Sequence, residues 1–371
     1  MIRRILKNLP PELYCLLSKR DYSKSSSIHD HSYDDVNKLA ATCYRIPSFF
    51  ILRVWRLIKI IRHERITHLV ACSGDRLDIP AAFIAASITG ISFVPYYFDD
   101  YVYQWPSSLM RLTARMAEST FMKHVAQVIV PNEFLRDAIK SRRGIEPKIV
   151  RNPGEYNSIP SISHQNPHGT VREYRIVYTG AVYHVNFSAF VDILKVLDAL
   201  KRDDIRLHIY TAQPLAFLKK NGICGPRVVY HEHLPAQEVA EIQKSADILL
   251  IPFSANSLVA EVVKTSAPAK MGDYLASGVP ILAYVPPDTF VGWYLRKNAC
   301  GVVVENSEAQ SLSEAICTLL ADESLRRSLV QNAFKCLDED FSCVIAQQAF
   351  LNALHPQNLW VTTHSGSFSS I

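Results

Sequence analysis

The chain has 371 residues, of which 48% are hydrophobic and 20% are charged. This balance is typical of a globular protein with room for two domains, and it excludes a chain that is mainly disordered. The formal net charge of +5 favours anionic small molecules or a membrane surface as partners and does not by itself indicate nucleic acid. The cysteines form no C-x-x-C pair and no Cys/His group at zinc spacing, so we expect reduced thiols, a cytoplasmic protein and no bound metal.

The first 160 residues are expected to form a Rossmann-like domain, although its usual opening is not recognisable. Residues 1–8 look helical and carry no secretory signal, and no glycine occurs before Gly74 to make the turn that normally follows a first strand. Strands are predicted at residues 13–17, 69–73, 91–96 and 127–130, and helices at 49–64, 80–89, 108–125 and 132–142. Gly90 separates a helix from a buried strand within the uncharged run 79–98, which therefore predicts core elements rather than a membrane span.

The predicted helix at residues 49–64 has one apolar stripe and one basic side. Its basic side chains are Arg53, Arg56, Lys59 and Arg62. Two interpretations of this pattern stay open. Either the helix packs on the sheet with a solvated basic face, or that face also rests on anionic lipid at the cytoplasmic side of a membrane.

A stretch rich in Ser, Pro, His and Asn follows the first domain, and we place the interdomain linker at residues 161–174. Strands and helices then alternate again through residues 175–340, which predicts a second Rossmann-like domain built on a parallel sheet. Its strands are predicted at 175–178, 206–211, 228–230, 248–252, 281–284 and 301–304, and its helices at 188–201, 214–221, 236–245, 268–277, 290–297 and 310–321. Residues 355–371 have little apolar content and are predicted to be a loose tail.

Residues 265–280 carry the most informative pattern. Thr265 or Ser266 is expected to cap a helix that ends at a glycine. A helix start with free backbone N–H groups, hydroxyls and Lys270 is suited to bind phosphate. The lysine would neutralise the negative charge that grows on a diphosphate as it leaves. Asp273 follows one turn later, where a carboxylate accepts hydrogen bonds from sugar or ribose hydroxyls. The alternative is a surface ion pair between Lys270 and Asp273.

This stretch resembles the donor-binding motif of family-four glycosyltransferases, in which a proline, a lysine, an acidic residue and a small-x-Gly-x-Pro ending recur in this order. Residues 126–135, 148–154 and 246–253 are similar to three further passages of that family, and the likeness covers residues 65–352. The resemblance implies the GT-B fold, in which two Rossmann-like α/β domains with parallel sheets face each other across a cleft. It also implies that residues 341–354 form a helix that crosses back to the first domain.

The resemblance assigns roles to the residues of this motif. Asp273 stands where the family has the second glutamate of a pair, which holds the ribose, and Lys270 lies near the diphosphate. Thr265 replaces the first glutamate. Gly180 matches the phosphate-side turn of the family, but the two cations that usually follow this turn are missing. We therefore expect the diphosphate to rest mainly on Lys270, the helix start and backbone amides.

Two loops that follow predicted strands add candidates. Asp99 and Asp100 come directly after a buried strand, and open α/β sheets bind ligands at such strand ends. We expect one of them, Asp100, to orient an acceptor hydroxyl. The expected catalytic residues are therefore Asp100, Lys270 and Thr265. An Asx-type turn is the alternative for these two aspartates. His233 lies in a loop that contacts the nucleotide base in similar enzymes. The expected donor-binding residues are Gly180, His233, Ser266, Lys270 and Asp273.

The sequence therefore predicts a glycosyltransferase that moves a sugar from a nucleotide-diphosphate co-substrate to a glycan or lipid-linked acceptor in polysaccharide or lipopolysaccharide-type synthesis. By resemblance, the reaction retains configuration and needs no metal or other cofactor. The alternative is a binding or scaffold protein that kept the GT-B fold and lost the chemistry, which the threonine at position 265 and the missing cations favour. A dinucleotide-dependent oxidoreductase is disfavoured because the chain contains no G-x-G-x-x-G.

Overall fold

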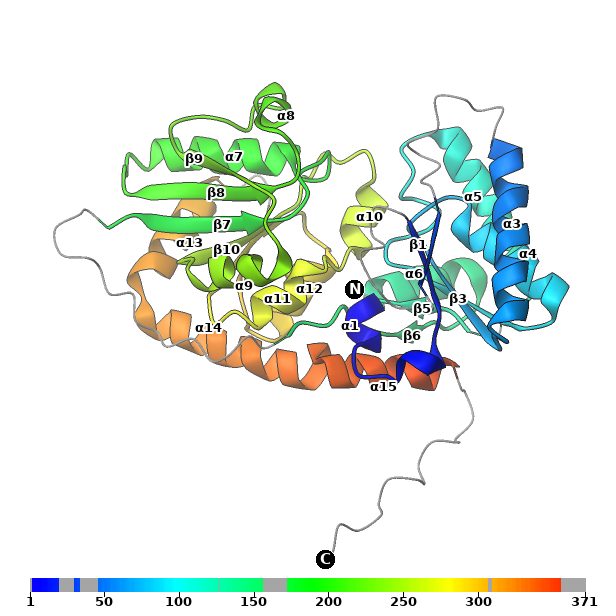
Figure 1. Cartoon of the computed structure of the whole chain (residues 1–371). Coiled ribbons are helices and arrows are strands. Elements are labelled where there is room, and N and C mark those ends of the chain that lie inside the picture. Colours follow the sequence, from blue (N-terminus) through cyan, green and yellow to red (C-terminus); the bar gives the residue numbers. More distant parts are fainter. Residues whose placement is uncertain are drawn as a thin grey trace, which may run out of the picture.

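The computed structural model describes residues 2–19, 30–33, 46–125, 127–155, 172–305 and 309–354. Two α/β units lie side by side, and the last helices run beneath both (Figure 1). Every strand pairing in these residues is parallel, which confirms the predicted fold class. Most of the predicted linker and the whole predicted tail lie outside the described residues.

The second unit is a doubly wound α/β domain. Its six-stranded sheet has the order β12-β11-β10-β7-β8-β9, so the direction of winding reverses between β7 and β10. The strands are β7 (Tyr174–Thr179), β8 (Ile205–Thr211), β9 (Val228–Glu232), β10 (Ile248–Pro252), β11 (Ile281–Val285) and β12 (Val302–Glu305). The helices are α7 (Phe187–Ala199), α8 (Leu215–Lys220), α9 (Ala236–Lys244), α10 (Ala260–Thr265), α11 (Lys270–Leu275), α12 (Phe290–Lys297) and α13 (Ala309–Ala321). Buried apolar clusters on both faces of the sheet hold these helices in place.

The first unit contains a smaller sheet of order β3-β4-β5-β6. Its strands are β3 (His68–Cys72), β4 (Ser92–Tyr96), β5 (Ile129–Val130) and β6 (Lys148–Ile149), and its helices are α3 (Ile46–His63), α4 (Asp78–Thr89), α5 (Ser108–Phe121) and α6 (Glu133–Arg143). A separate pair is formed by β1 (Leu16–Lys19) and β2 (Asp30–Tyr33). The predicted strand at 13–17 thus begins three residues later, after a short 3-10 turn at Pro11–Leu13.

Two local predictions for this unit are confirmed by its helix ends. Gly90 closes α4 in the left-handed conformation with φ 72°, and β4 follows, so the uncharged run 79–98 is a helix and a buried strand. Asn132 caps α6 by accepting a hydrogen bond from the backbone N–H of Leu135, and Gly144 closes this helix with φ 70°. Within the described residues, no helix is long and apolar enough to cross a membrane.

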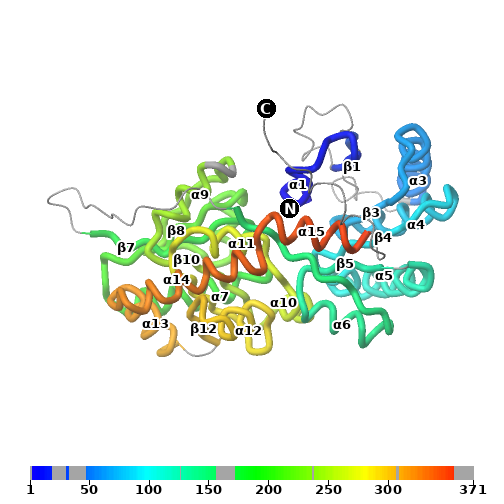
Figure 2. The backbone as a smooth tube through the Cα atoms, turned by 90° about the horizontal axis from the view of Figure 1, so that it is seen from below, coloured from blue at the N-terminus to red at the C-terminus, as the bar shows by residue number. Residues whose placement is uncertain are grey.

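The final helices connect the two units. They are α14 (Glu323–Cys336), a π-helical turn (Leu337–Phe341) and α15 (Cys343–Leu354). Seen from below, α14 lies under the second unit and α15 under the first (Figure 2). There α15 packs against the short helix α1 (Ile2–Leu6) through Phe350 and Ile5, and Gln347 donates a hydrogen bond to the Ile5 carbonyl over 2.8 Å.

Candidate active site

The carboxyl ends of β7 and β10 form the point where the second sheet reverses its winding, and such points are where open α/β sheets bind ligands. Gly180 directly follows β7, and its φ of 129° is a conformation that side chains disfavour. A Cβ atom at this position would lie 3.0 Å from the Lys270 ammonium. Glycine therefore leaves room for a lysine at the switch point.

Lys270 is the first residue of α11, and its ammonium lies 3.5 Å from the centre of the Tyr178 ring. Burial holds the pKa of Lys270 well below its usual range. Among the described residues, no carboxylate lies within ion-pair distance of this ammonium. A desolvated cation of this kind, beside a glycine turn, is suited to an anion that is not part of the protein.

The segment that precedes α11 is fixed by the first unit. Asn132 donates a hydrogen bond from Nδ2 to the Thr265 carbonyl over 2.7 Å, and Asn152 donates one to the Ala267 carbonyl over 2.6 Å. Gly154 and Gly272 meet backbone to backbone, because a Cβ at Gly154 would lie 2.1 Å from the Gly272 carbonyl oxygen. These contacts set the position of α11, and with it Lys270, relative to the first unit.

Asp99 and Ser266 come from different units and meet at the boundary between them. The Ser266 hydroxyl donates to Asp99 Oδ1 over 3.5 Å. Burial raises the pKa of Asp99 to about 6, and the hydrogen bond from Ser266 acts against that rise. The sequence predicted that Thr265 or Ser266 would cap the following helix, but neither residue caps α11. Thr265 is the last residue of α10, and Ser266 is the residue at its C-cap.

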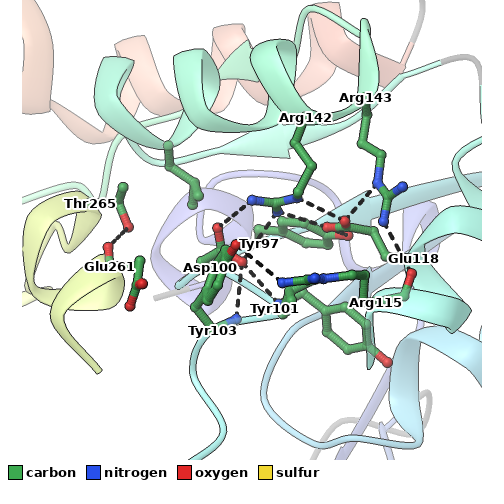
Figure 3. Close-up of polar contacts among 12 residues, drawn as sticks. Tyr97, Asp100, Tyr101, Tyr103, Arg115, Glu118, Arg142, Arg143, Glu261 and Thr265 are labelled. Atoms are coloured by element: carbon green, nitrogen blue, oxygen red, sulfur yellow. Dashed lines mark hydrogen bonds and ion pairs between the residues drawn. The ribbon is translucent and has the colours of Figure 1, made fainter. Parts of the chain in front are cut away.

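Asp100, the expected catalytic carboxylate, is held inside the first unit instead. Its carboxylate accepts two hydrogen bonds from Arg142, over 3.0 and 3.2 Å, and its Oδ1 also accepts from the backbone N–H groups of Val102 and Tyr103. Figure 3 shows this arrangement, in which Arg142 also reaches the fully buried Glu118. Asp100 therefore forms the Asx-type turn that was the alternative prediction. The carboxylate that contacts Ser266 of the second unit is that of Asp99.

Thr265, the second expected catalytic residue, lies on the side of α10 that faces the first unit, but its hydroxyl is engaged within its own helix. It is 5% exposed, and its hydroxyl donates to the Glu261 carbonyl over 2.9 Å within α10 (Figure 3). A threonine that bonds back to its own helix is satisfied locally. In this chain, the position that corresponds to the first glutamate of the family motif therefore holds a threonine whose hydroxyl bonds within its own helix.

The remaining candidates lie further out. Asp273 accepts two hydrogen bonds from Arg4, over 2.6 and 3.3 Å, so it is engaged by the first unit and not by Lys270. His233 is exposed in the loop after β9. Among the described residues, no group of three or more His, Cys, Asp and Glu side chains is arranged to hold a metal ion.

A pocket of about 430 Å³ lies between the units, next to this site. The first unit lines it from the loop after β4 and from α6, and the second unit lines it from α10. The lining residues include Asp100, Tyr103, Phe134, Arg142, Glu261 and Lys264. Aromatic rings together with charged side chains from both units make it suited to a small polar molecule.

Comparison with known families identifies the second unit. Residues 173–322 match the family model described as glycosyl transferases group 1. The second unit is a glycosyltransferase domain of group 1, and the chain as a whole has the GT-B fold. A comparison with curated proteins finds no match.

Solved structures share the fold of this glycosyltransferase at low sequence identity. The Anabaena protein HepE, in complex with UDP, is 14% identical with a TM-score of 0.62 and 82% coverage of each chain. Sucrose-phosphate synthase from Thermosynechococcus elongatus is 15% identical with a TM-score of 0.57, covering 86% of this chain and 79% of its own. WaaG, a glycosyltransferase involved in lipopolysaccharide biosynthesis, is 14% identical with a TM-score of 0.52, covering 83% and 96%.

Sequence reasoning missed two features of the glycosyltransferase site. Arg4 reaches Asp273 across 269 positions of the chain, and no local pattern signals such a contact. Asn132 and Asn152 were recognisable as a helix cap and as part of an Asn-Pro-Gly turn. Their side-chain bonds to the segment before α11 depend on how the two units pack, which the local pattern does not encode.

Proposed function

We propose that this glycosyltransferase binds a nucleoside diphosphate sugar with its diphosphate on Lys270 and transfers the sugar to a hydroxyl of a glycan or lipid-linked acceptor. The observation that carries the proposal is the buried ammonium at the switch point, which has no carboxylate partner among the described residues. The similar structures support it, because the one of HepE is a complex with UDP.

In the proposed reaction, the bond between the sugar C1 and the diphosphate oxygen breaks, and a bond from C1 to the acceptor oxygen forms. Lys270 stabilises the charge that develops on the leaving diphosphate. The backbone amide that follows Gly180 adds a donor on the same side. We assign retention of configuration, in which the acceptor proton passes to the leaving phosphate oxygen, and we propose that Lys270 serves in place of a metal ion.

The acceptor is proposed to enter through the interdomain pocket. Asp99 replaces Asp100 as the residue that orients the acceptor hydroxyl, because only Asp99 faces Ser266 of the donor domain. The Asp100 carboxylate has a supporting role, since it fixes the loop that carries Tyr103 into the pocket. Glu261 and Lys264 approach the same pocket from α10 and offer further contacts to acceptor hydroxyls.

A membrane-facing role for α3 is also part of the proposal. Ile51, Leu52 and Trp55 are 67%, 56% and 53% exposed, and the Lys59 ammonium lies 3.5 Å from the Trp55 ring centre. Aromatic, aliphatic and basic groups on one exposed face suit anionic lipid. Arg53 does not belong to this face. It is 7% exposed and pairs with Asp75 and Asp78.

We infer from this surface that the protein lies on the cytoplasmic side of a membrane and builds a polysaccharide or lipopolysaccharide-type glycan. The similarity to WaaG, a glycosyltransferase involved in lipopolysaccharide biosynthesis, supports this inference.

The test is calorimetry with UDP, GDP and ADP, followed by hydrolysis or transfer assays with the matching nucleotide sugars. Lys270→Met is expected to lose roughly tenfold to a hundredfold in affinity for the preferred nucleotide, which is the usual strength of a charge-assisted contact. Lys195→Met, an exposed lysine on α7, is the matched control. Binding without turnover would favour the scaffold alternative, and no binding of any nucleoside diphosphate would refute the proposal.

A further inference from the structure

An ion pair joins the first helix of the chain to the donor domain. Both guanidinium nitrogens of Arg4 donate to the Asp273 carboxylate, over 2.6 and 3.3 Å, and the side chains of the two residues are 34% and 26% exposed. Arg4 also donates to the Pro153 carbonyl over 3.0 Å. The guanidinium is therefore fixed by two elements besides its own helix.

The helix that carries Arg4 is itself held in the first domain. Ile5 is fully buried against Tyr96 and Phe350, and its carbonyl accepts a hydrogen bond from Gln347 of α15. In Figure 1, α1 lies between the first sheet and α11. Arg4 thus extends a rigid part of the first domain to the carboxylate of the second.

The geometry leaves acceptor capacity on Asp273. A carboxylate offers about four lone-pair positions, and Arg4 uses one on each oxygen. Burial raises the pKa of Asp273, and the hydrogen bonds and charge of Arg4 act against that rise. An ionised carboxylate in a fixed orientation, with lone pairs free, is a strong acceptor for two neighbouring hydroxyls.

We propose that Arg4 is a positioning residue of the donor site, which orients the Asp273 carboxylate to accept the ribose hydroxyls of the nucleotide. The inference rests on the proposed function, because it requires the nucleotide to lie along α11 with its diphosphate at Lys270. Ribose recognition then depends on both domains. The first domain contributes a donor-site residue even though it is the domain that receives the acceptor.

The experiment compares the affinities of UDP, GDP and ADP with those of their 2′-deoxy forms by calorimetry, using the nucleotide that wild type binds best. Wild type is expected to prefer the ribose form by roughly tenfold. In Arg4→Gln this preference is expected to disappear while the affinity for the deoxy form changes little. Arg4→Lys should restore part of the preference. Asp273→Asn should abolish it, and adding Arg4→Gln should then have no further effect.

Lys7→Gln is the matched control, because it breaks the neighbouring ion pair between α1 and Glu155, at 3.1 Å, without touching Asp273. A merely structural role for Arg4 would lower the affinity for both nucleotide forms together and leave their ratio unchanged, which would overturn the inference. The inference would also fail if wild type did not distinguish the two forms. Neither result would touch the proposed binding of the donor, which fails if wild type binds no nucleoside diphosphate or binds it independently of Lys270.

Discussion

Asp99 of the first domain and Ser266 of the second share a hydrogen bond across the interdomain boundary, with 3.5 Å between the carboxylate oxygen and the hydroxyl oxygen. The contact brings together a loop that follows β4 and the segment that connects α10 to α11. It is also the point where a carboxylate with a raised pKa meets the donor domain. An acceptor hydroxyl placed between these residues would have a partner from each domain.

The pH dependence of transfer should report the ionisation of Asp99. Burial raises the pKa of Asp99 to about 6, so the carboxylate is ionised, and able to accept a hydrogen bond from the acceptor, only above that pH. We expect kcat/KM to rise with pH through about 6 and to level off above it. Asp99→Asn should lower the plateau by roughly tenfold to a hundredfold and remove the inflection. Asp192→Asn, on α7, should leave the profile as in wild type, and an inflection that persists in Asp99→Asn would contradict the assignment.

Nucleotide binding should be coupled to proton uptake by Lys270. Burial lowers the pKa of the free ammonium, and a bound diphosphate raises it again. Affinity is therefore highest below the lowered pKa and declines as the pH rises above it. Calorimetry in two buffers with different ionisation enthalpies should show uptake in wild type and none in Lys270→Arg, whose guanidinium stays charged. Equal binding enthalpies in both buffers at every pH below the ordinary pKa of lysine would speak against the predicted coupling.

The Arg142 network is expected to dominate the stability of the first domain. Arg142 pairs with Asp100 and Glu118, whose side chains are 2% and 0% exposed. Arg142→Met leaves one buried carboxylate without its ion pair and weakens the other, which should cost roughly 3–5 kcal/mol in the free energy of unfolding. Arg136→Met removes an exposed pair and should change it by less than about 0.5 kcal/mol. Urea denaturation measures the free energy of unfolding of both variants. Similar losses in the two would show that the buried network contributes no more to stability than an exposed ion pair.

The backbone contact between Gly154 and Gly272 makes a second stability prediction. A Cβ at Gly272 would lie 2.6 Å from the Gly154 nitrogen and 2.8 Å from the Asn152 carbonyl oxygen. We expect Gly272→Ala to cost roughly 1–3 kcal/mol in unfolding free energy and to weaken nucleotide binding, because α11 carries Lys270. Gly74→Ala is the control, since nothing lies within 4 Å of a Cβ built there. Unfolding curves that coincide for the two variants would disprove the close approach.

Binding to anionic lipid tests the proposed membrane face. The double variant Lys59→Glu and Arg62→Glu should bind vesicles containing phosphatidylglycerol at least roughly tenfold more weakly than wild type, and raised salt should weaken wild type as well. The control, Arg327→Glu with Lys335→Glu, makes the same change of charge on the exposed face of α14. Co-sedimentation gives the readout. Equal losses in the two double variants would mean that net charge alone, and not the α3 face, determines binding.

Local sequence patterns predicted the elements of both domains well where a residue has a fixed stereochemical role. Gly90 and Gly144 end helices in the left-handed region, and Asn132 caps a helix, just as such residues do in short peptides. The helix α10 was not predicted.

The candidate site was only partly predictable from the sequence. The resemblance assigned both Lys270 and Gly180 to the diphosphate side of the site, and the structure brings the Lys270 ammonium next to Gly180. The choice between Asp99 and Asp100 could not be made, because neighbouring residues point in opposite directions and the partner of Asp100, Arg142, lies 42 positions away. The Arg4 contact depends on how the domains pack, and no local pattern encodes that packing.

The meeting of Gly154 and Gly272 also limits how the enzyme can open. The two glycine backbones are in direct contact, and we expect the domains to open by rotating about this contact. A rotation about this point moves Asp99 away from Ser266, and it moves Lys270 far less, because Lys270 lies only two residues from Gly272. An opening of this kind would admit an acceptor while leaving the diphosphate site intact, which favours an order of events in which the donor stays bound between encounters with acceptors.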